Sequence, residues 1–399
     1  YVATSSLALN SGTINDVAGN AATLTLASPG ATNSLGANKA LIIDTTLPTV
    51  SSVTSTKSNG IYNVDDVIAI TVTFSEAVVV SGTPQLTLET GATDGVINYA
   101  SGSASSVLTF YYTVASGHNS SDLDYVSTSA LALNGGSIND AAGNAATLTL
   151  ASPGATNSLG ANKAIIIDTM SPTVASVSSS SSNATYNIDD VIAVTVTFSE
   201  NVNVVGTPQL TLETGSSDAV VNYTSGSGGS VLTFNYTVAS GRSSSDLDYI
   251  STSALALNNG TIKDASENAA TLTLASPGAT NSLGNSKAIV VDGIVPTVSS
   301  VASSSSNGNY KIGDVIGITV TFSEAVTVSG TPQITLETGS SDAVVNYTSG
   351  SGGTTLTFNY TVSEGHGSSD LDYVSTSALA LNSGSILDAS GNSASLTLA

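Results

Sequence analysis

The sequence predicts an all-β protein that consists of tandem two-sheet β-sandwich domains. Three observations support this prediction. The chain repeats itself, apolar residues alternate with threonine and other polar residues along short segments, and clusters of Ser, Gly, Asn and Asp separate these segments. A period of two is typical of a strand with one buried face, and no stretch has a helical period long enough to count. Self-similarity at a fixed step is the signature of a repeat architecture.

The repeat is clearest in a proline-containing segment. Asp44–Val50 returns as Asp168–Val174 and again as Asp292–Val298, which is a step of 124 residues both times. Each copy follows a short apolar run and precedes an alternating one. Proline cannot donate to a ladder and biases the preceding residue toward extended geometry. The sequence therefore predicts a short, stiff joint between domains, with one carboxylate at its entrance.

These joints divide the chain into four segments. Residues 1–43 form the C-terminal part of one repeat, residues 44–167 and 168–291 are complete repeats, and residues 292–399 form a repeat that lacks its last strand. Because Tyr1 aligns with Tyr125, in the middle of a repeat, we expect the sequence to be a window from a longer array.

Within a repeat, the strands follow from the alternation. Along residues 67–74, Ile68, Ile70, Val72 and Phe74 lie on one face, and Ala69, Thr71 and Thr73 lie on the solvent side. The run 108–114 and the pairs at 86–88 and 148–150 alternate in the same way. About seven short strands with turn signals at intervals near ten residues predict a two-sheet sandwich. Several such domains end to end would form an elongated rod.

Composition restricts the classes of partner. The chain has 29 acidic and 7 basic residues, a formal net charge of −22, two histidines and no cysteine. This balance excludes sequence-independent nucleic-acid binding, which needs clustered Lys and Arg, and disfavours anionic membranes. Without cysteine there are no disulfides and no thiolate metal sites. No apolar run approaches 18 residues, so we expect no membrane insertion in this segment. Divalent cations are the natural partner.

Three short motifs carry a resemblance to a known group of proteins. They are Phe74-Ser75-Glu76 after a strand, Asp140-Ala141-Ala142-Gly143-Asn144 late in the repeat, and the joint that begins at Asp44. Together they resemble the immunoglobulin-like repeats of large bacterial cell-surface adhesins and related repeat-rich surface proteins. The resemblance covers essentially the whole chain. It implies a secreted, extracellular and elongated stalk or filament that is stiffened by Ca²⁺.

When the repeats are aligned, the acidic residues fall at the same positions, which we call columns. Each acid except Glu267 and Glu364 has another acid 124 residues away. Counting strands from the joint places Glu76 and Asp140 at the pole that carries Asp44. It places Asp66, Asp122 and Asp124 at the far pole, where they would face Asp168, Glu200 and Asp264 of the next repeat. Carboxylates that converge without basic partners repel one another, and Ca²⁺, which takes six to eight oxygen ligands, would relieve the repulsion.

The sequence thus predicts Ca²⁺ as the bound ion, held by the acids of these columns. The candidate metal ligands are Asp44, Asp66, Glu76, Asp122, Asp124, Asp140, Asp168, Asp190, Glu200, Asp246, Asp248, Asp264, Asp292, Asp314, Glu324, Asp370, Asp372 and Asp388. The alternative interpretation is that these acids cap turns and stay solvated, as an aspartate in an Asx-turn does. The recurring Lys39, Lys163 and Lys287 are expected to be solvated lysines at a strand edge, with an isopeptide bond as the minor alternative.

No nucleophile–base–acid set and no phosphate-binding loop is present in the sequence, so we do not expect an enzyme. The leading hypothesis is an extracellular structural array, either the stalk of a surface adhesin or the subunit of a surface filament. Two alternatives stay open. One is an adhesion module that binds glycans or a surface, and the other is a self-assembling sheath, S-layer or fibre in which copies of the chain are the partners.

Overall fold

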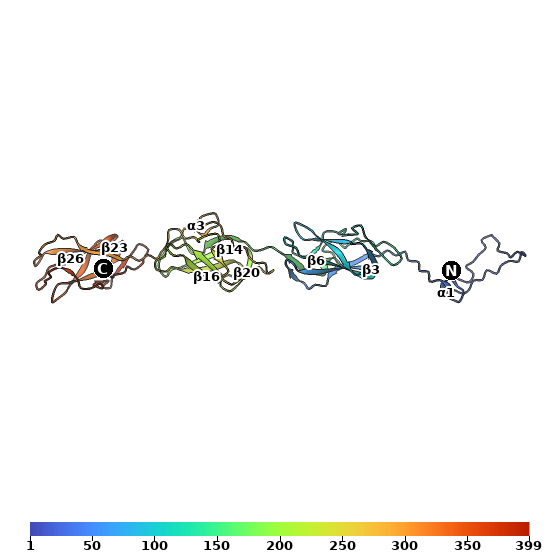
Figure 1. Ribbon diagram of the computed structural model, residues 1–399, viewed down its shortest axis with the longest axis horizontal. Helices are drawn as coiled ribbons and strands as arrows, with labels where there is room; N and C mark the ends of the chain where they lie inside the picture. The colour runs from blue at the N-terminus through green and yellow to red at the C-terminus, as the bar shows by residue number, and fades with distance from the viewer. Residues whose placement is uncertain (399) are drawn as a thin grey trace. The chain divides into compact units, whose positions relative to one another are not determined.

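The computed structural model describes residues 1–398 and shows an all-β chain of tandem β-sandwich domains (Figure 1). Ala399, the last residue of the predicted fourth segment, lies outside the described residues. The chain divides into two compact units, one of residues 1–169 and one that begins at Met170. The first unit contains one sandwich, which we call the first. The second unit contains two, which we call the middle and the last.

Each sandwich repeats one order of strands. In the first they are β1 (Val50–Ser55), β2 (Gly60–Tyr62), β3 (Val67–Ser81), β4 (Gln85–Glu89), β5 (Gly95–Ser101), β6 (Ser105–Thr113), β7 (Asn119–Ser120), β8 (Asp124–Tyr125), β9 (Leu131–Ala132), β10 (Ser137–Asn139) and β11 (Ile165–Asp168). In the middle they are β12 (Val174–Ser179), β13 (Thr185–Tyr186), β14 (Val191–Val205), β15 (Gln209–Leu212), β16 (Ala219–Ser225), β17 (Gly229–Thr237), β18 (Ser243–Ser244), β19 (Leu255–Ala256), β20 (Thr261–Lys263) and β21 (Val290–Asp292). In the last they are β22 (Val298–Ser303), β23 (Val315–Ser329), β24 (Gln333–Glu337), β25 (Ala343–Ser349), β26 (Gly353–Thr361), β27 (Asp372–Tyr373), β28 (Leu379–Ala380) and β29 (Ser385–Leu387).

Single helical turns precede three of the joints, at α1 (Leu35–Asn38), α2 (Leu159–Asn162) and α3 (Leu283–Ser286). The sequence pattern predicts no helix here, because a turn of four residues is too short to show a helical period. Each turn begins at a serine whose side chain accepts a backbone N–H three residues later, which is the usual role of an N-cap residue.

A single long strand belongs to both sheets of the sandwich. The first half of β3 pairs with β1 and β6, and its last three residues, from Val79, pair with β10. Between Thr73 and Val78 the register with β6 shifts, as at a β-bulge, and such irregularities bend a strand and re-aim its side chains. β5 also changes sheet, pairing first with β4 and then with β6. The alternation predicted β3 only as far as Phe74, and the structure continues it through the bend.

The core lies between the two sheets and follows the predicted alternation. Ile68, Ile70 and Val72 are fully buried, and Phe110 packs among them. The middle and last sandwiches have separate clusters of the equivalent residues. One detail differs from the expected solvent face, because Thr71 is also buried, and its hydroxyl donates to the carbonyl of Thr54 on β1.

The last strand closes one edge of the sandwich. β11 lies parallel to β2 and antiparallel to β7, and places Ile165 and Ile167 in the core. β21 lies between β13 and β18 in the same way. Residues 292–398 contain no counterpart of this three-stranded sheet, and Tyr310, whose equivalents Tyr62 and Tyr186 pack on the core, is 37% exposed.

The recurring lysine column has a structural role. Lys163 Nζ donates to the carbonyl of Lys57 at 2.9 Å, and Lys287 Nζ donates to the carbonyl of Ser181 at 3.1 Å. Each bond holds the segment before the last strand against its own sandwich.

Gly226 and Gly228 belong to one turn before β17 of the middle sandwich and differ in the space that a larger side chain would have. Both have positive φ, but a Cβ at Gly226 would lie 2.0 Å from the carbonyl oxygen of Val231, whereas a Cβ at Gly228 meets nothing within 4 Å. We expect Gly228→Ala to cost about 1 kcal/mol for the left-handed backbone alone. Gly226→Ala adds a steric cost of about 1–3 kcal/mol. Urea unfolding of both variants measures the difference, and equal losses would contradict it.

Candidate metal centre

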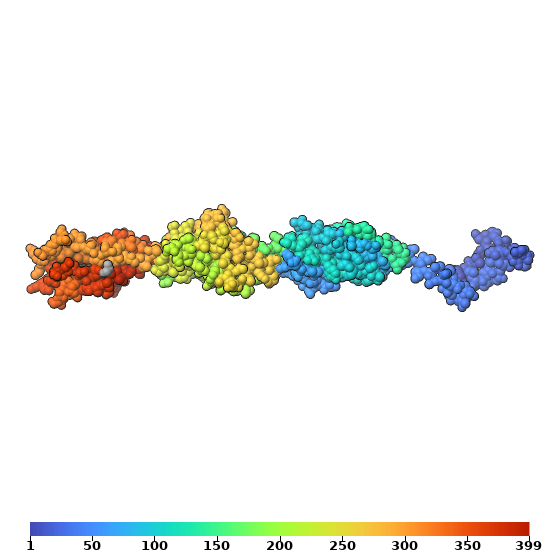
Figure 2. Space-filling view, viewed as in Figure 1, coloured from blue at the N-terminus to red at the C-terminus, as the bar shows by residue number. Residues whose placement is uncertain are grey.

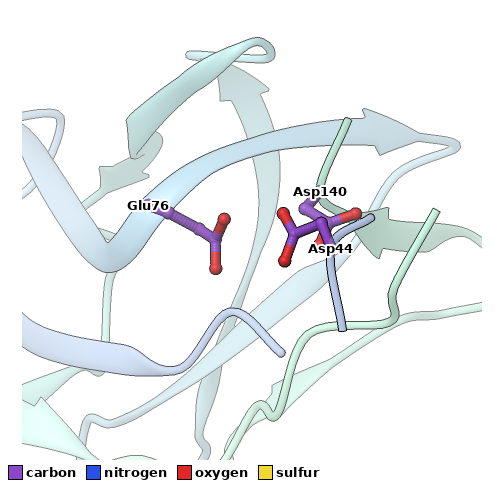
Figure 3. Close-up of side chains that lie close together, drawn as sticks. All are labelled: Asp44, Glu76 and Asp140. Atoms are coloured by element: carbon purple, nitrogen blue, oxygen red, sulfur yellow. The ribbon is translucent and has the colours of Figure 1, made fainter. Parts of the chain in front are cut away.

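Three carboxylates meet at the proline-containing joint of the first sandwich. Asp44 comes from the joint, Glu76 from the bend of β3, and Asp140 from the loop that follows β10. One ligand atom from each lies within 4.8 Å of the other two. Figure 3 shows Glu76 reaching from its strand toward Asp44 and Asp140, which lie close together. We call these three residues the acid triad.

The bend in β3 explains the position of Glu76. This residue lies in the register shift between Thr73 and Val78, where the strand passes from one sheet to the other. The same shift contains Glu200 in β14 and Glu324 in β23. A regular strand would place this glutamate in a ladder, whereas the bulge leaves it free to point along the end of the sandwich.

Asp140 is held by a dense set of hydrogen bonds. Its Oδ1 accepts the backbone N–H groups of Ala142 and Asn144, each at 2.8 Å, and its Oδ2 accepts the side-chain amide of Asn144 at 2.7 Å. The side chain is buried, and burial opposes its ionisation. The bonds from Asn144, Ala142 and Gly143 outweigh that effect and hold the pKa of Asp140 below its ordinary value, since they favour the charged form.

Asn144 also fixes the joint to the sandwich. Its side-chain amide donates to the backbone carbonyl of Asp44 at 3.0 Å. Asp44 Oδ1 in turn accepts the N–H of Thr46 at 3.0 Å. In the sequence, Asn144 is recognisable only as part of a turn motif. Its recurrence as Asn268 and Asn392 was the signal that could have marked it as more than a turn residue.

The acid triad lacks compensating positive charge. Across residues 1–398 the one salt bridge joins Lys263 and Glu267, on an exposed surface. Asp44, Glu76 and Asp140 make no ion pair with lysine or arginine. Three carboxylates at this spacing therefore have no basic side chain to reduce their mutual repulsion.

The equivalent residues at the next joint are Asp292, which ends β21 of the middle sandwich, and Glu324 and Asp388 of the last sandwich, in a somewhat different arrangement. Ser390 Oγ donates to Asp292 Oδ2 at 2.5 Å. The set does not reach the 4.8 Å spacing of the acid triad. Burial, followed by the charges of Asp388 and Asp292, raises the pKa of Glu324. Glu324 Oε1 is buried and has no hydrogen-bond partner, which is uncommon for a buried carboxylate oxygen and leaves it available to a ligand.

The middle repeat carries the same positions in sequence, at Asp168, Glu200 and Asp264. Asp264 is buried, and its Oδ1 accepts the N–H groups of Ser266 and Asn268 at 2.8 Å each. This arrangement matches that of Asp140, with a different residue at the position of Ala142.

The far-pole acids do not join these sets as the sequence analysis expected. Asp122 and Asp124 lie against the turn of α2, where a Cβ at Gly160 would be 3.3 Å and 3.0 Å from their respective Oδ2 atoms. Asp122 and Asp124 flank Leu123, which bonds to Ile165 at the start of β11, whereas Asp168 is the last residue of that strand and pairs with Asn119. The grouping of Asp122 and Asp124 with Asp168 was therefore wrong. Counting strands assigned these residues to one pole, whereas the pairing places them at the two ends of β11.

These two acids have roles inside their own sandwich. Asp124 Oδ2 accepts the N–H of Gly154 at 2.9 Å. Burial, then the charge of Asp124, raises the pKa of Asp122, and a backbone bond from Ile165 opposes this shift. Asp246 and Asp248 lie against Gly284 in the same way. Asp370 and Asp372 of the last sandwich are exposed.

The remaining far-pole acids cap a turn. Asp66, Asp190 and Asp314 each accept the backbone N–H three residues earlier, at 2.9–3.0 Å. The turn that contains Asp190 contacts the last sandwich through its neighbours. Asn187 donates to the carbonyl of Ser390, and Ile188 N–H donates to Asn392 Oδ1. The expected contact between a far pole and the next joint thus forms here, but through amides in place of carboxylates.

The raised pKa of Glu324 gives a test by pH. A folded-state pKa above the unfolded value of about 4.5 means that the proton favours the fold. The stabilisation that the protonated Glu324 gives to the folded state is complete below pH 4.5. It is lost as the pH rises through the folded-state pKa of Glu324. In chelator, we expect Glu324→Gln to stabilise the last sandwich at neutral pH, by at most about 1 kcal/mol after solvent screening. The expected gain vanishes near pH 4.

Hydrogen-exchange mass spectrometry of peptides from the last sandwich measures this effect in the whole chain. Asp342→Asn, an exposed acid on the hairpin of the same sandwich, is the matched control and should leave exchange unchanged. An equal gain in both variants, or a gain that persists at pH 4, would contradict the assignment to Glu324.

Comparison with known proteins shows no family for the chain. No protein-family model and no curated protein matches the chain. Among solved structures, the I67–I69 fragment of the titin I-band is similar at 8% identity, with 80% of this chain and 90% of that chain covered and a TM-score of 0.28. A Corynebacterium diphtheriae protein, provisionally described as membrane anchored, is similar at 8% identity, with 79% of each chain covered and a TM-score of 0.19. No helix among residues 1–398 is long and apolar enough to cross a membrane.

Proposed function

We propose that the chain is an extracellular structural array whose joints bind Ca²⁺. The observation that carries this proposal is the acid triad, because Asp44, Glu76 and Asp140 bring ligand atoms within 4.8 Å of one another and make no ion pair among the described residues. Three carboxylates in this arrangement are stable when a cation lies between them.

The donor set favours Ca²⁺ over other metals. All three side chains offer oxygen, and the chain has no cysteine and two histidines, so zinc lacks its usual ligands. Ca²⁺ accepts irregular geometry and six to eight oxygens, whereas Mg²⁺ needs a near-ideal octahedron. Two of the carboxylates are only partly buried, which leaves room for water to complete the coordination.

A cation bound by the carboxylates of a joint would lie at the boundary between two domains. Asp292 is the last residue of β21, in the middle sandwich, and its charge acts on Glu324 of the last one. A bound ion would therefore connect the end of one domain to the bend of the next. In the same unit, Asn187 and Ile188 already bond to the loop at Ser390 and Asn392, so the ion would reinforce an existing contact.

This chemistry suits a mechanical role and not catalysis. We infer that the array serves as the stalk of a cell-surface adhesin or as the subunit of a surface filament. Extracellular Ca²⁺ would be abundant enough to occupy sites of modest affinity. Glycan or surface binding by the domains themselves stays a prediction.

Calorimetric titration with Ca²⁺ tests the metal site. We expect Asp140→Asn and Glu76→Gln to remove one binding equivalent from the chain, because each removes a ligand from one of the repeated sites. Asp94→Asn, an exposed hairpin acid in the same sandwich, should leave the stoichiometry unchanged. At a hundred times the dissociation constant, Ca²⁺ should stabilise a sandwich by about 2.7 kcal/mol. Absence of binding in the unmodified chain would overturn the proposal.

Small-angle scattering tests the structural role separately. If the ion stiffens the joints, removal of Ca²⁺ by a chelator should broaden the distribution of chain dimensions, and adding Ca²⁺ back should restore it. The Asp94→Asn variant should respond like the unmodified chain. Dimensions that do not change with Ca²⁺ would leave a metal site without the proposed stiffening.

A further inference from the structure

Ser390 lies in the loop that follows β29 and bonds twice to the middle sandwich. Its side-chain Oγ donates to Asp292 Oδ2 at 2.5 Å, and its backbone carbonyl accepts the side-chain amide of Asn187 at 2.9 Å. Asp292 ends β21, and Asn187 follows β13. Figure 2 shows the yellow and orange surfaces of the middle and last sandwiches in contact at this boundary. Ser390 therefore connects the joint carboxylate to the loop of the next domain.

The first sandwich has the same loop without the hydroxyl. Asp140 Oδ1 accepts the backbone N–H of Ala142 at 2.8 Å, and Asp388 Oδ1 accepts that of Ser390 at 2.8 Å. The loop backbone is thus held in the same way in both sandwiches. In the sequence, this position carries alanine at 18 and 142 and serine at 266 and 390, so one chain contains both residue types.

The two joint aspartates also have matching surroundings, except at one oxygen. Oδ1 of Asp44 and of Asp292 accepts the N–H two residues later, at 3.0 Å and 3.2 Å. Their backbone carbonyls accept the side-chain amides of Asn144 and Asn392, at 3.0 Å and 2.9 Å. The difference is at Oδ2, which receives the serine hydroxyl at Asp292 and has no such donor at Asp44, because the loop there carries alanine.

The hydroxyl is found together with a more open set of acids. In the acid triad, one ligand atom of each carboxylate lies within 4.8 Å of the other two, whereas Asp292, Glu324 and Asp388 do not reach this spacing. Glu324 Oε1 is left buried without a hydrogen-bond partner. An O–H···O⁻ bond is among the stronger hydrogen bonds of proteins, so it favours a position of the Asp292 carboxylate against the loop.

A cation and the serine hydroxyl compete for the same carboxylate oxygen. To offer Oδ2 to an ion, Asp292 must give up or share the bond from Ser390, and the free energy of that bond is subtracted from the free energy of ion binding. A net hydrogen bond to a charged group shifts an equilibrium by about tenfold or more. At Asp44 no such bond has to be broken.

We propose that the residue at this position, Ser390 in the last sandwich and Ala142 in the first, sets how strongly each joint depends on Ca²⁺. The serine hydroxyl substitutes for the ion, because it holds the joint carboxylate to the loop without metal and weakens metal binding. With alanine, the carboxylate is free for the ion and has no hydroxyl in its place. This inference rests on the proposed Ca²⁺ sites and makes them unequal, so the joints of one array respond at different Ca²⁺ concentrations.

A second role for the hydroxyl would give the opposite result. Ser390 Oγ could itself be an oxygen ligand of the cation, since Ca²⁺ accepts neutral oxygen donors as well as carboxylates. Removal of the hydroxyl would then weaken Ca²⁺ binding, whereas removal of a competing donor strengthens it. The sign of the change in affinity therefore separates the two roles.

Reciprocal substitutions in the whole chain test the inference, with hydrogen-exchange mass spectrometry during a Ca²⁺ titration as the readout for each joint. Ser390→Ala should lower the Ca²⁺ concentration for half-protection of residues 292–298 and 386–393 by about tenfold. Ala142→Ser should raise it for residues 44–50 and 138–145 by a similar factor. Each variant should leave the other joint unchanged. Ser340→Ala, at an exposed hairpin serine of the last sandwich, is the matched control and should change neither.

The same variants in chelator test the hydroxyl without any metal. Ser390→Ala should speed exchange at residues 292–298 by up to about tenfold, because the joint carboxylate loses its bond to the loop. Ala142→Ser should slow exchange at residues 44–50. Ala142 is exposed and Ser390 is half-buried, so neither substitution disturbs the core.

The outcomes distinguish this inference from the proposed function. An unchanged or higher Ca²⁺ midpoint in Ser390→Ala, or exchange in chelator that neither variant alters, would overturn the role of the hydroxyl and leave the Ca²⁺ sites in place. If neither joint of the unmodified chain gains protection with Ca²⁺, the proposed function is wrong, and this inference fails with it.

Discussion

The bend in the long strand is the constraint on which the rest of the sandwich depends. β3 must bury Ile68, Ile70 and Val72 in one sheet and then join β10 in the other. It can do so only by interrupting its register, and the interruption contains Glu76. The position of the glutamate is thus a consequence of core packing. Because the same bend recurs in β14 and β23, each sandwich presents an acid at the same end.

The charges around this bend are balanced in two different ways. Asp140 is stabilised in its ionised form by amide donors that the surrounding loop provides, even though it is buried. Glu324 has no such donors on its buried oxygen, and burial, followed by the charges of Asp388 and Asp292, opposes its ionisation. The surroundings of Asp140 therefore favour its charged form, whereas those of Glu324 oppose its charged form. A bound cation would offset the repulsion at Glu324 and leave the hydrogen bonds of Asp140 intact, which is why we propose a metal site in preference to solvated turn acids.

Much of this arrangement could be predicted from the sequence, because it depends on periodicity. The alternation of Ile68, Ile70 and Val72 gave the buried face, and the recurrence of Asp44, Glu76 and Asp140 gave a common pole. The limits are physical as well. Counting strands does not tell where along a neighbouring strand a loop lies, so Asp122 and Asp124 were grouped with Asp168, although they lie beside the opposite end of β11. The role of Asn144 depends on a bond to a carbonyl distant in sequence, and no local pattern reports such a bond.

The position of Asp292 has a consequence for how the two sandwiches of the second unit unfold. This residue ends β21, where it pairs with Ser243, and it also accepts the hydroxyl of Ser390 in the following domain. Melting of either sandwich must therefore release a residue on which its neighbour relies. The free energies of the two domains are not independent, and their unfolding has the nearest-neighbour cooperativity of a one-dimensional lattice. A damaged domain in such an array weakens the domains beside it before any distant one.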